Sequence, residues 1–379
     1  MTPTAAHATP ASGDPYAAAG VDTAAGDRAV ELMKAAVAAT HGPEVLGGVG
    51  GFAGLFDASA LTGYRRPLLA SSTDGVGTKI AIARALDLHD TIGQDLVGMV
   101  VDDIVVVGAR PLFMTDYIAC GAVVPERIAA IVRGIAHACA ETGTALVGGE
   151  TAEHPGLMAP DDYDVAGAAV GVVEADALLG PERVRHGDVV VAIASSGLHS
   201  NGFSLVRRLV EARGLDYADE VPDFGSSLGE ALLEPTRLYT GPLVRLLDEL
   251  PGTVHALAHV TGGGIGANLA RVLPPGARVE LDRATWAPPA VFRVLAGWGS
   301  LELTALEGTW NLGIGMLAVV EAGAASSVLR ALDAEGLPAW VAGRVAFEPG
   351  AVAPEGEGWI HGAKGVDGGA VRLVGAFAA

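Results

Sequence analysis

The chain has 379 residues, half of them hydrophobic, and a formal net charge of -20 at pH 7. Single cores seldom grow beyond about 250–300 residues, so this length predicts two domains. The acidic balance excludes a surface that binds nucleic acid or anionic lipid by neutralising phosphates. Every apolar segment of bilayer length is interrupted by charges or turn residues, so no membrane span is expected. Its two cysteines, Cys120 and Cys139, favour a reducing compartment, so we expect a cytoplasmic protein without nucleic-acid or membrane partners.

The N-terminal part begins with residues 1–14, which are rich in Ala, Thr, Pro and Ser and are expected to form a disordered tail. Apolar residues at helical spacing predict a helix between Tyr16 and Thr40. The glycine-rich stretch Gly47–Gly54 follows, and it is either a linker or a lid over a ligand. The glycines alone favour the linker.

Ser72–Lys79 combines a carboxylate, two glycines, a hydroxyl and a lysine within eight residues, after a strand predicted over Arg66–Ser72. These groups suit a phosphate ligand with a divalent metal. Lysine occurs in this chain only as Lys34, Lys79 and Lys364, so its use here in place of arginine suggests a compact point charge at the ligand. An exposed lysine after an ordinary glycine turn is the alternative, and the loop alone supports it about equally.

An apolar helix predicted over Ile92–Gly108 carries Asp95, Asp102 and Asp103. Asp95 and Asp102 are seven positions apart and therefore share one face. Carboxylates in apolar surroundings need a compensating partner, and a metal ion is the partner that we expect here.

Two further elements complete the first half. Pro125–Thr142 is predicted to be a helix, because proline stands at its start and glycine follows its end. Thr144–Gly156 is expected to form a strand followed by a double-glycine turn, and it carries two acids. Tyr163–Val173 is expected to form a further strand. A cap or a turn would explain any one acid, but three acidic clusters beside a lysine loop favour an ATP site with Mg²⁺.

The second half is expected to begin after a boundary near residues 174–187, and it repeats an order of strand, glycine turn and helix. A strand over 188–194 leads into the turn 195–202, whose hydroxyls and N–H groups suit an anion at a helix start. His199 in that turn is favoured as a ligand contact over a structural histidine. Residues 258–268 repeat the order, a third glycine element at 307–316 precedes a strand at 317–321, and short strands or loops are expected after Gly350.

Taken together, these motifs resemble those of phosphoribosylformylglycinamidine cyclo-ligases, also called aminoimidazole ribonucleotide synthetases, from Tyr16 to about Val345. The resemblance is carried by Gly50–Phe52, Thr73–Lys79, Asp90–Gly93, Gly148–Glu153, Ser195–Gly202 and His259–Gly264. The wider superfamily includes selenophosphate synthetase, thiamine-phosphate kinase and a hydrogenase maturation dehydratase. The cyclo-ligase is favoured by the chain length, by the lack of a cysteine before Cys120 and by the histidine at 259. There is no Walker A loop, so ATP would bind through a different fold.

The resemblance implies an α/β subunit of the α+β type with two domains. Residues 15–174 would form an ATP-binding and dimerisation domain whose mixed sheet pairs across a homodimer. Residues 175–349 would form an α/β substrate domain, and residues 350–379 a glycine-rich tail. The apolar strand Leu112–Ala119 supports the homodimer, because an apolar sheet edge should be covered.

The implied reaction is the ATP-dependent closure of formylglycinamidine ribonucleotide to 5-aminoimidazole ribonucleotide through an iminophosphate, with release of ADP and phosphate. We expect Lys79, Asp103 and His199 to be catalytic, and Asp74, Asp103 and Glu150 to hold Mg²⁺. The expected ATP contacts are Asp74, Gly75, Gly77, Thr78, Lys79, Asp103, Gly48, Gly50 and Gly51. The expected substrate contacts are Ser195, Ser196, Gly197, His199, Ser200, Asn201, His259 and Thr261.

Two residues depart from the family pattern. Asp102 stands where asparagine is common, and its charge is expected to strengthen or crowd the metal site; His154 stands where methionine is common. Two other functions stay open at this point: a kinase or dehydratase of the same superfamily, and a non-catalytic nucleotide-binding regulator.

Overall fold

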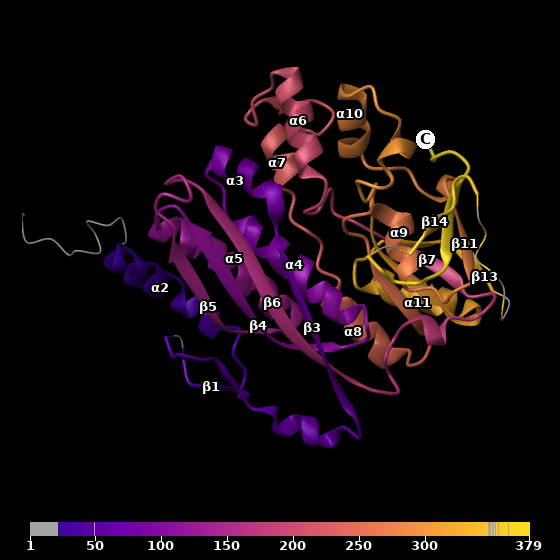
Figure 1. The fold of residues 1–379 in the computed structure, drawn as a ribbon, viewed down its shortest axis with the longest axis horizontal. Helices are drawn as coiled ribbons and strands as arrows, with labels where there is room; N and C mark the ends of the chain where they lie inside the picture. The colour runs from indigo at the N-terminus through magenta and orange to yellow at the C-terminus, as the bar shows by residue number, and fades with distance from the viewer. Residues whose placement is uncertain are drawn as a thin grey trace, which may run out of the picture.

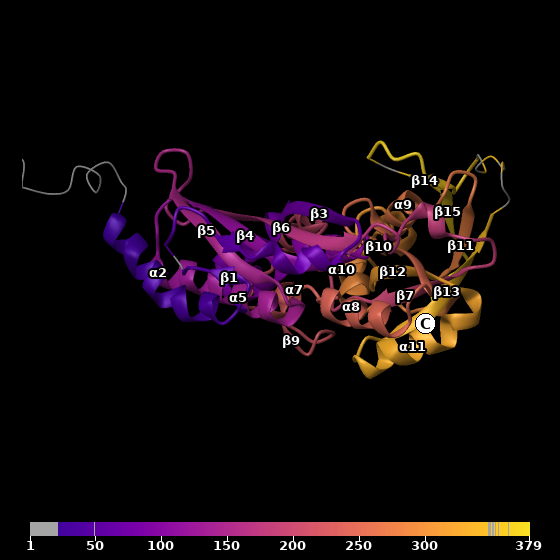
Figure 2. The ribbon, with the colours of Figure 1, turned by 90° about the horizontal axis from the view of Figure 1, so that it is seen from below.

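The computed structural model describes residues 22–48, 50–347, 350, 352, 354, 356–362 and 364–379. The tail predicted for residues 1–14 lies outside the described residues. Two sheets lie side by side along the long axis of the molecule, one formed by the N-terminal half and one by the C-terminal half (Figures 1 and 2). The predicted domain limits, 15–174, 175–349 and 350–379, are not decided by strand pairing and stay predictions.

The N-terminal sheet is mixed, as expected. Its order is β3 (Pro67–Gly75), β6 (Tyr163–Glu174), β4 (Arg110–Cys120) and β5 (Ala145–Glu153), with β4 and β5 parallel and the other pairs antiparallel. Helix α4 (Asp90–Val105) packs against β3 and β6, α5 (Pro125–Thr142) packs on α4, and α2 (Thr23–Ala38) packs on α5. Smaller elements are β1 (Val45–Leu46), β2 (Leu55–Phe56) and α3 (Ile80–Leu86).

Helix α5 shows why the sequence predicted this region well. It begins at Pro125 and ends before Gly143, whose φ of 67° lies in the left-handed region that favours glycine. Ile128, Ile131 and Ile135 are buried along one face at helical spacing. The predicted bounds 125–142 are confirmed because both caps and the apolar period are local properties of the chain.

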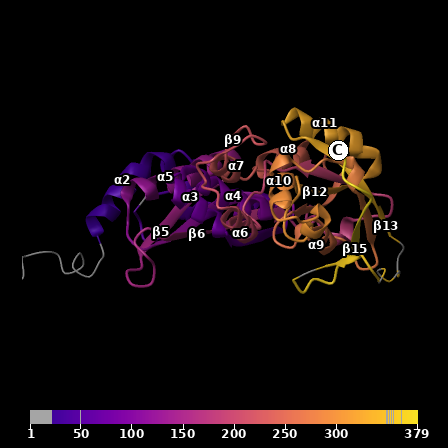
Figure 3. The same cartoon turned by 90° about the horizontal axis from the view of Figure 1, so that it is seen from above.

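The C-terminal sheet has seven strands in the order β10, β12, β7, β13, β11, β15, β14. All pairs are antiparallel except β11 with β15. The strands are β7 (Val189–Ala194), β10 (Val254–His259), β11 (Arg278–Asp282), β12 (Ile314–Val320), β13 (Ala339–Ala346), β14 (Ile360–His361) and β15 (Ala370–Val374). Its helices are α6 (Phe203–Arg213), α7 (Leu228–Leu233), α8 (Thr240–Glu249), α9 (Gly264–Arg271), α10 (Ala290–Trp298) and α11 (Ala325–Ala334). Helices α6, α7 and α8 lie at the junction with the helices of the N-terminal half (Figure 3).

Two expectations about the N-terminal sheet are wrong. The double-glycine turn expected within 144–156 is absent, because β5 runs straight through Gly148 and Gly149. Gly149 pairs with Asp116 of β4, and a Cβ on Gly149 would lie 2.3 Å from Asp116 Oδ1, so this glycine makes room for a neighbouring side chain.

The strand over Leu112–Ala119 is not a sheet edge, since β4 lies between β6 and β5. Met114 and Ile118 are buried, whereas Tyr117, which points to the opposite face, is 41% exposed. The edge argument for a homodimer therefore fails, although the homodimer itself stays a prediction. Among the described helices, none is both long and apolar enough to cross a membrane.

Candidate active site

Helix α4 carries the acids that link the two halves of the molecule. Asp102 is fully buried, and its Oδ1 accepts hydrogen bonds from Tyr239 N (3.0 Å), Thr240 N (2.8 Å) and Thr240 Oγ1 (2.7 Å). Burial raises the pKa of Asp102 to about 6, although the charge of His259 and these donors oppose the shift. Asp102 Oδ1 thus caps the start of α8, whereas Asp102 Oδ2 is buried without a partner among the described residues. The expectation that Asp102 strengthens or crowds a metal site stays a prediction.

Lys79 and Asp95 form a second buried contact. Lys79 Nζ lies 2.8 Å from each carboxylate oxygen of Asp95 and 2.7 Å from the carbonyl oxygen of Glu234, and neither charged side chain is exposed. Burial lowers the pKa of Lys79 and raises the pKa of Asp95, and the pairing opposes both shifts. Asp95 and Asp102 do share one face of α4, as predicted, but protein donors compensate them where a metal ion was expected.

Asp103, the next residue of α4, is different because its side chain is 44% exposed. Its Oδ1 lies 2.9 Å from Nδ1 of His259, at the end of β10. Burial alone would lower the pKa of His259, but the hydrogen bond and charge of Asp103, with Asp102 and Asp74 nearby, raise it. The pKa of Asp74 is raised by partial burial and by the charge of Asp103, against a hydrogen bond from Gly75 N–H. The structure therefore pairs Asp103 with His259 and places Asp74 close enough for its charge to interact with both. We call these three residues the acidic cluster.

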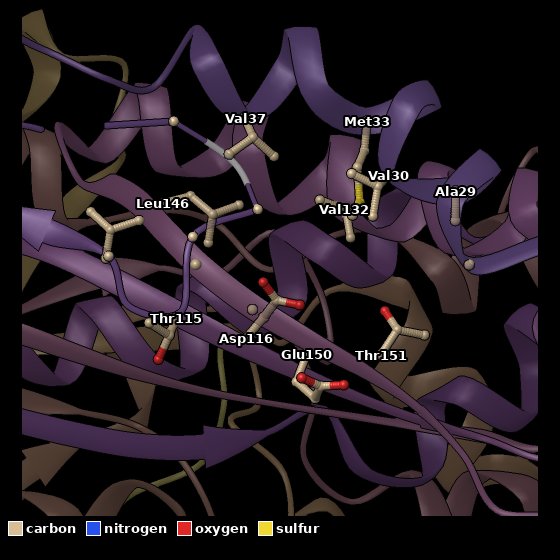
Figure 4. A pocket seen from close by; sticks show the side chains of 18 of the residues that line it. Ala29, Val30, Met33, Val37, Thr115, Asp116, Val132, Leu146, Glu150 and Thr151 are labelled. Atoms are coloured by element: carbon tan, nitrogen blue, oxygen red, sulfur yellow. The ribbon is translucent and has the colours of Figure 1, made fainter. Parts of the chain in front are cut away.

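A cavity of about 580 Å³ lies between α2 and β5 on the helix-covered face of the N-terminal sheet (Figure 4). Apolar side chains of α2 and α5, among them Met33 and Val132, line one wall. Asp116 supplies a carboxylate, and Glu150 and the expected ATP residues Gly48, Gly50 and Gly51 also belong to the lining of this cavity. An apolar slot with a few polar groups is the usual form of a small-molecule site.

Strand register places these groups relative to the acidic cluster. Asp74, Gly167, Asp116 and Gly149 pair in one row across β3, β6, β4 and β5, so the side chains of Asp74 and Asp116 point to the same face. Glu150 pairs with Tyr117 in the adjacent row and points to the opposite face. Among the described residues no three metal-ligating side chains converge. The Mg²⁺ ligand set of Asp74, Asp103 and Glu150 is thus not assembled within the described part of one chain and stays a prediction.

The turn 195–202 holds most of the expected substrate residues, and many of them have internal partners. Ser195 Oγ donates to Asn311 Oδ1 at 3.2 Å, and Ser196 Oγ donates to Pro235 O at 2.6 Å. His199 is 1% exposed and has a φ of 60°. Its Nε2 accepts from Ser196 N at 3.2 Å and from Arg237 N at 3.5 Å, and Nδ1 has no partner among the described residues.

His199 is a neutral imidazole in this environment. Burial and then the charges of His259, Lys79 and Arg237 hold its pKa well below the ordinary value. Because Nε2 accepts two N–H groups, the ring proton is on Nδ1. His199 can therefore donate one hydrogen bond through Nδ1, and it is poorly suited to act as an imidazolium acid at neutral pH. Of the other expected contacts, Asn201 and Thr261 are partly exposed beside the glycine turn at 262–264.

Asp116 is the functional candidate that sequence reasoning missed. It is almost fully buried on β4 and points into the cavity, with its carboxylate directed toward α2 (Figure 4). Burial raises its pKa to about 7. A single acid in the apolar run Leu112–Ala119 was a usable signal, because an unpaired carboxylate in a buried strand is costly and often functional.

Comparisons with known proteins agree with one another. The chain matches the family models "AIR synthase related protein, N-terminal domain" over residues 57–173 and "AIR synthase related protein, C-terminal domain" over residues 185–353. A phosphoribosylformylglycinamidine cyclo-ligase of Sorangium cellulosum is 50% identical over 331 residues, which cover 87% of this chain and 94% of that protein.

Two solved structures share the fold. Thiamine-monophosphate kinase from Stenotrophomonas maltophilia K279a superposes with a TM-score of 0.64 at 21% identity, over 92% of this chain and 96% of that one. The hydrogenase maturation protein HypE in complex with ATP superposes with a TM-score of 0.57 at 20% identity, over 86% and 87% of the two chains. At such identities the likeness is one of fold.

Proposed function

The chain belongs to the phosphoribosylformylglycinamidine cyclo-ligase family and is an ATP-dependent ligase of purine biosynthesis, and we propose that it closes the imidazole ring at the junction of its two sheets. The observation that carries this placement is the open cluster of Asp74, Asp103 and His259. It joins the glycine-rich loop after β3 to the end of β10, where the second sheet meets the first.

The proposed reaction uses ATP to phosphorylate the formyl oxygen of formylglycinamidine ribonucleotide. The amidine nitrogen then attacks the activated carbon, the C–O bond to the phosphorylated oxygen breaks, and phosphate leaves as the ring closes. Phosphoryl transfer of this kind depends on positioning and charge neutralisation more than on covalent catalysis. Gly77 and Thr78 follow Asp74 in the same loop and would bind phosphate oxygens through N–H and hydroxyl groups, whereas the N–H of Gly75 donates to Asp74 Oδ1.

Mg²⁺ is the second part of the proposal. Asp74 and Asp103 fit a divalent cation, because both offer carboxylate oxygens, and burial together with the charge of Asp103 raises the pKa of Asp74. His259 lies 2.9 Å from Asp103 and still leaves that side chain 44% exposed. When bound, the ion would neutralise phosphate charge. Glu150 points to the exposed face of the sheet, so we propose that its carboxylate reaches the acids of a second subunit across the homodimer.

We also propose a homodimer formed through the exposed face of the N-terminal sheet. Leu69 of β3 is 65% exposed and Tyr117 of β4 is 41% exposed on this face, which the described helices leave uncovered. Light scattering at micromolar concentration should report twice the subunit mass of 38.2 kDa. An active, monodisperse monomer would remove the homodimer and the Glu150 contact across it.

The proposed activity is tested by ADP release in the presence of formylglycinamidine ribonucleotide, with thiamine phosphate and selenide as competing substrates. We expect turnover with the first alone. Turnover with thiamine phosphate would favour a kinase, and ATP binding without any turnover would favour a nucleotide-binding regulator.

Asp74→Asn tests the metal part separately. We expect weaker binding of Mg²⁺–ATP by calorimetry with an unchanged thermal midpoint, because Asp74 supports no other described element. Unchanged Mg²⁺–ATP affinity would assign this acid to structure.

A further inference from the structure

An extended segment joins the two halves of the molecule at the site. We call it the strap: residues 234–239, which lie between α7 and α8 without regular secondary structure. The strap passes over α4 on one side and the turn 195–202 on the other. Its contacts with each side are buried hydrogen bonds from consecutive residues.

On the N-terminal side, Asp95 and Lys79 hold the strap. Asp95 Oδ1 accepts from Thr236 N at 2.8 Å and from Thr236 Oγ1 at 2.7 Å. Lys79 Nζ donates to Glu234 O at 2.7 Å, and Gln94 Nε2 donates to Thr236 O at 2.8 Å. A Cβ on Gly98, one turn along α4 from Asp95, would lie 2.6 Å from Thr236 Cγ2, so this glycine makes room for the strap.

On the C-terminal side, the strap holds the turn that carries His199. Pro235 O accepts from Ser196 Oγ at 2.6 Å, and Arg237 N donates to His199 Nε2 at 3.5 Å. Ser200 Oγ and Thr236 Oγ1 lie 3.4 Å apart. Thr236 donates its hydroxyl proton to Asp95, so in the Ser200 contact it can only accept, and the direction of the bond is fixed.

We propose that Lys79 and Asp95 are positioning residues: they clamp the strap to α4, and the strap in turn fixes the orientation of His199 and of the turn 195–202 at the site. A fully buried ion pair is poor evidence for stability, because a well-packed apolar pair often replaces it without loss. The hydrogen bonds of Lys79 and Asp95, however, have fixed directions. The acceptors and donors of this pair fix the hydroxyl of Thr236 and the carbonyl of Glu234, which an apolar pair cannot do.

The clamp gives Lys79 a role different from a direct triphosphate contact, and the two roles predict different kinetics. If Lys79 acts through the strap, Lys79→Met should lower kcat about 10- to 100-fold, as misplaced reacting groups do, with the KM for ATP within twofold of the parent value. If Lys79 binds the triphosphate, the KM for ATP should rise at least tenfold in Lys79→Met and stay unchanged in Asp95→Asn. That second result would overturn the proposal.

A double variant separates positioning from plain structural support. Lys79→Met/Asp95→Leu leaves no unpaired buried charge, so its thermal midpoint should recover relative to each single variant. Its kcat should stay low, because Thr236 N–H has lost its acceptor. Recovery of kcat together with the thermal midpoint would overturn the proposal and leave the pair a structural one.

Hydrogen exchange supplies a readout that does not depend on activity. In the double variant the amides of Thr236 and Arg237 should exchange faster, while those of α5 keep their protection. Unchanged exchange in the strap would contradict the clamp. Thr236→Val is the milder variant if the double variant fails to fold: it removes only the hydroxyl, and we expect a several-fold fall in kcat at an unchanged KM for ATP.

The matched control is Glu335→Gln, which breaks the ion pair between Arg245 in α8 and Glu335 directly after α11. We expect its kcat, its KM for ATP and its strap exchange to equal those of the parent. A fall in kcat in this variant would mean that loss of any ion pair perturbs turnover, and the clamp would then lose its support.

Discussion

Asp102 and Asp103 are adjacent on α4, yet their surroundings are opposite. Asp102 is fully buried and accepts three hydrogen bonds from the start of α8, whereas Asp103 is 44% exposed and faces His259 and the charge of Asp74. Protein donors occupy Oδ1 of the first carboxylate, whereas the second carboxylate interacts with the charge of another acid. An acid's partners, rather than its position in an apolar helix, therefore distinguish a structural role from a ligand site.

The largest expected effect is on stability, at Asp102. Asp102→Ala would leave the N–H groups of Tyr239 and Thr240 buried without an acceptor, at about 1–3 kcal/mol each, so we expect a loss of about 2–6 kcal/mol in the free energy of unfolding. The Thr240 hydroxyl keeps an acceptor in Val101 O at 3.2 Å. Urea unfolding measures the loss. Asp102→Asn keeps Oδ1 as an acceptor and should lose much less. Equal losses in both variants would show that the charge, and not the capping geometry, stabilises α8.

Asp103→Asn should show the reverse pattern. We expect turnover to fall about 10²-fold, as when one preorganised electrostatic group is lost, with a free energy of unfolding close to the parent value. The two measurements belong side by side with those on Asp102→Asn. A variant that loses stability and keeps normal turnover would assign Asp103 to structure and remove the contrast between the two acids.

Asp116 sharpens the comparison, because it is buried like Asp102 but lacks such donors. Its pKa rises to about 7 in the folded chain from an ordinary value near 3.8, so the folded state binds the proton more tightly than the unfolded state. The contribution of Asp116 is most favourable below about pH 4 and is lost as pH rises toward about 7. Asp116→Asn should flatten this dependence and gain about 1–2 kcal/mol at pH 8, a partial gain because the amide is also buried.

Unfolding by urea at pH 5 and pH 8 measures that change. An equal pH dependence in the parent and in Asp116→Asn would mean that the carboxylate is ionised in the folded protein throughout this range.

The smallest effect is expected at Gly149. A Cβ there would meet Asp116 Oδ1, which is the end of a side chain that can turn away, so Gly149→Ala should cost about 1 kcal/mol or less. It should nevertheless lower the pKa of Asp116 by moving the carboxylate toward solvent in the cavity. Infrared or NMR titration of the carboxyl group reports this shift, and an unchanged pKa would show that the cavity, not the close packing, sets it.

Much of the fold follows from local pattern. The helix at 125–142, the strand at 163–173 and the order of strand, glycine turn and helix at 258–268 were predicted from caps, apolar period and glycines, and the structure has α5, β6 and then β10 with α9 at those places. The shared face of Asp95 and Asp102 was also predictable, because it depends only on helical geometry. The family was predictable too, since its motifs are short and lie within single segments.

The partners of these residues could not be predicted in the same way. Asp95 and Thr236 are 141 positions apart in the sequence, and Asp102 and Thr240 are 138 positions apart. The residues near either acid in the sequence do not indicate that contact. Lys79 was predicted to contact phosphate because it follows a glycine-rich loop, but its Nζ is buried against Asp95. Likewise Gly149 looked like a turn residue because the side chain that it accommodates belongs to another strand.

Local sequence is enough to place most helices and strands, the acids and glycines on them, and the family of the chain, because these depend on neighbours a few positions apart. Only the tertiary structure decided which acids have protein donors and which are left to a ligand. That choice depends on the packing of one half of the chain against the other, which brings α8 and the strap to Asp102 and Asp95 and leaves Asp103 open beside Asp74.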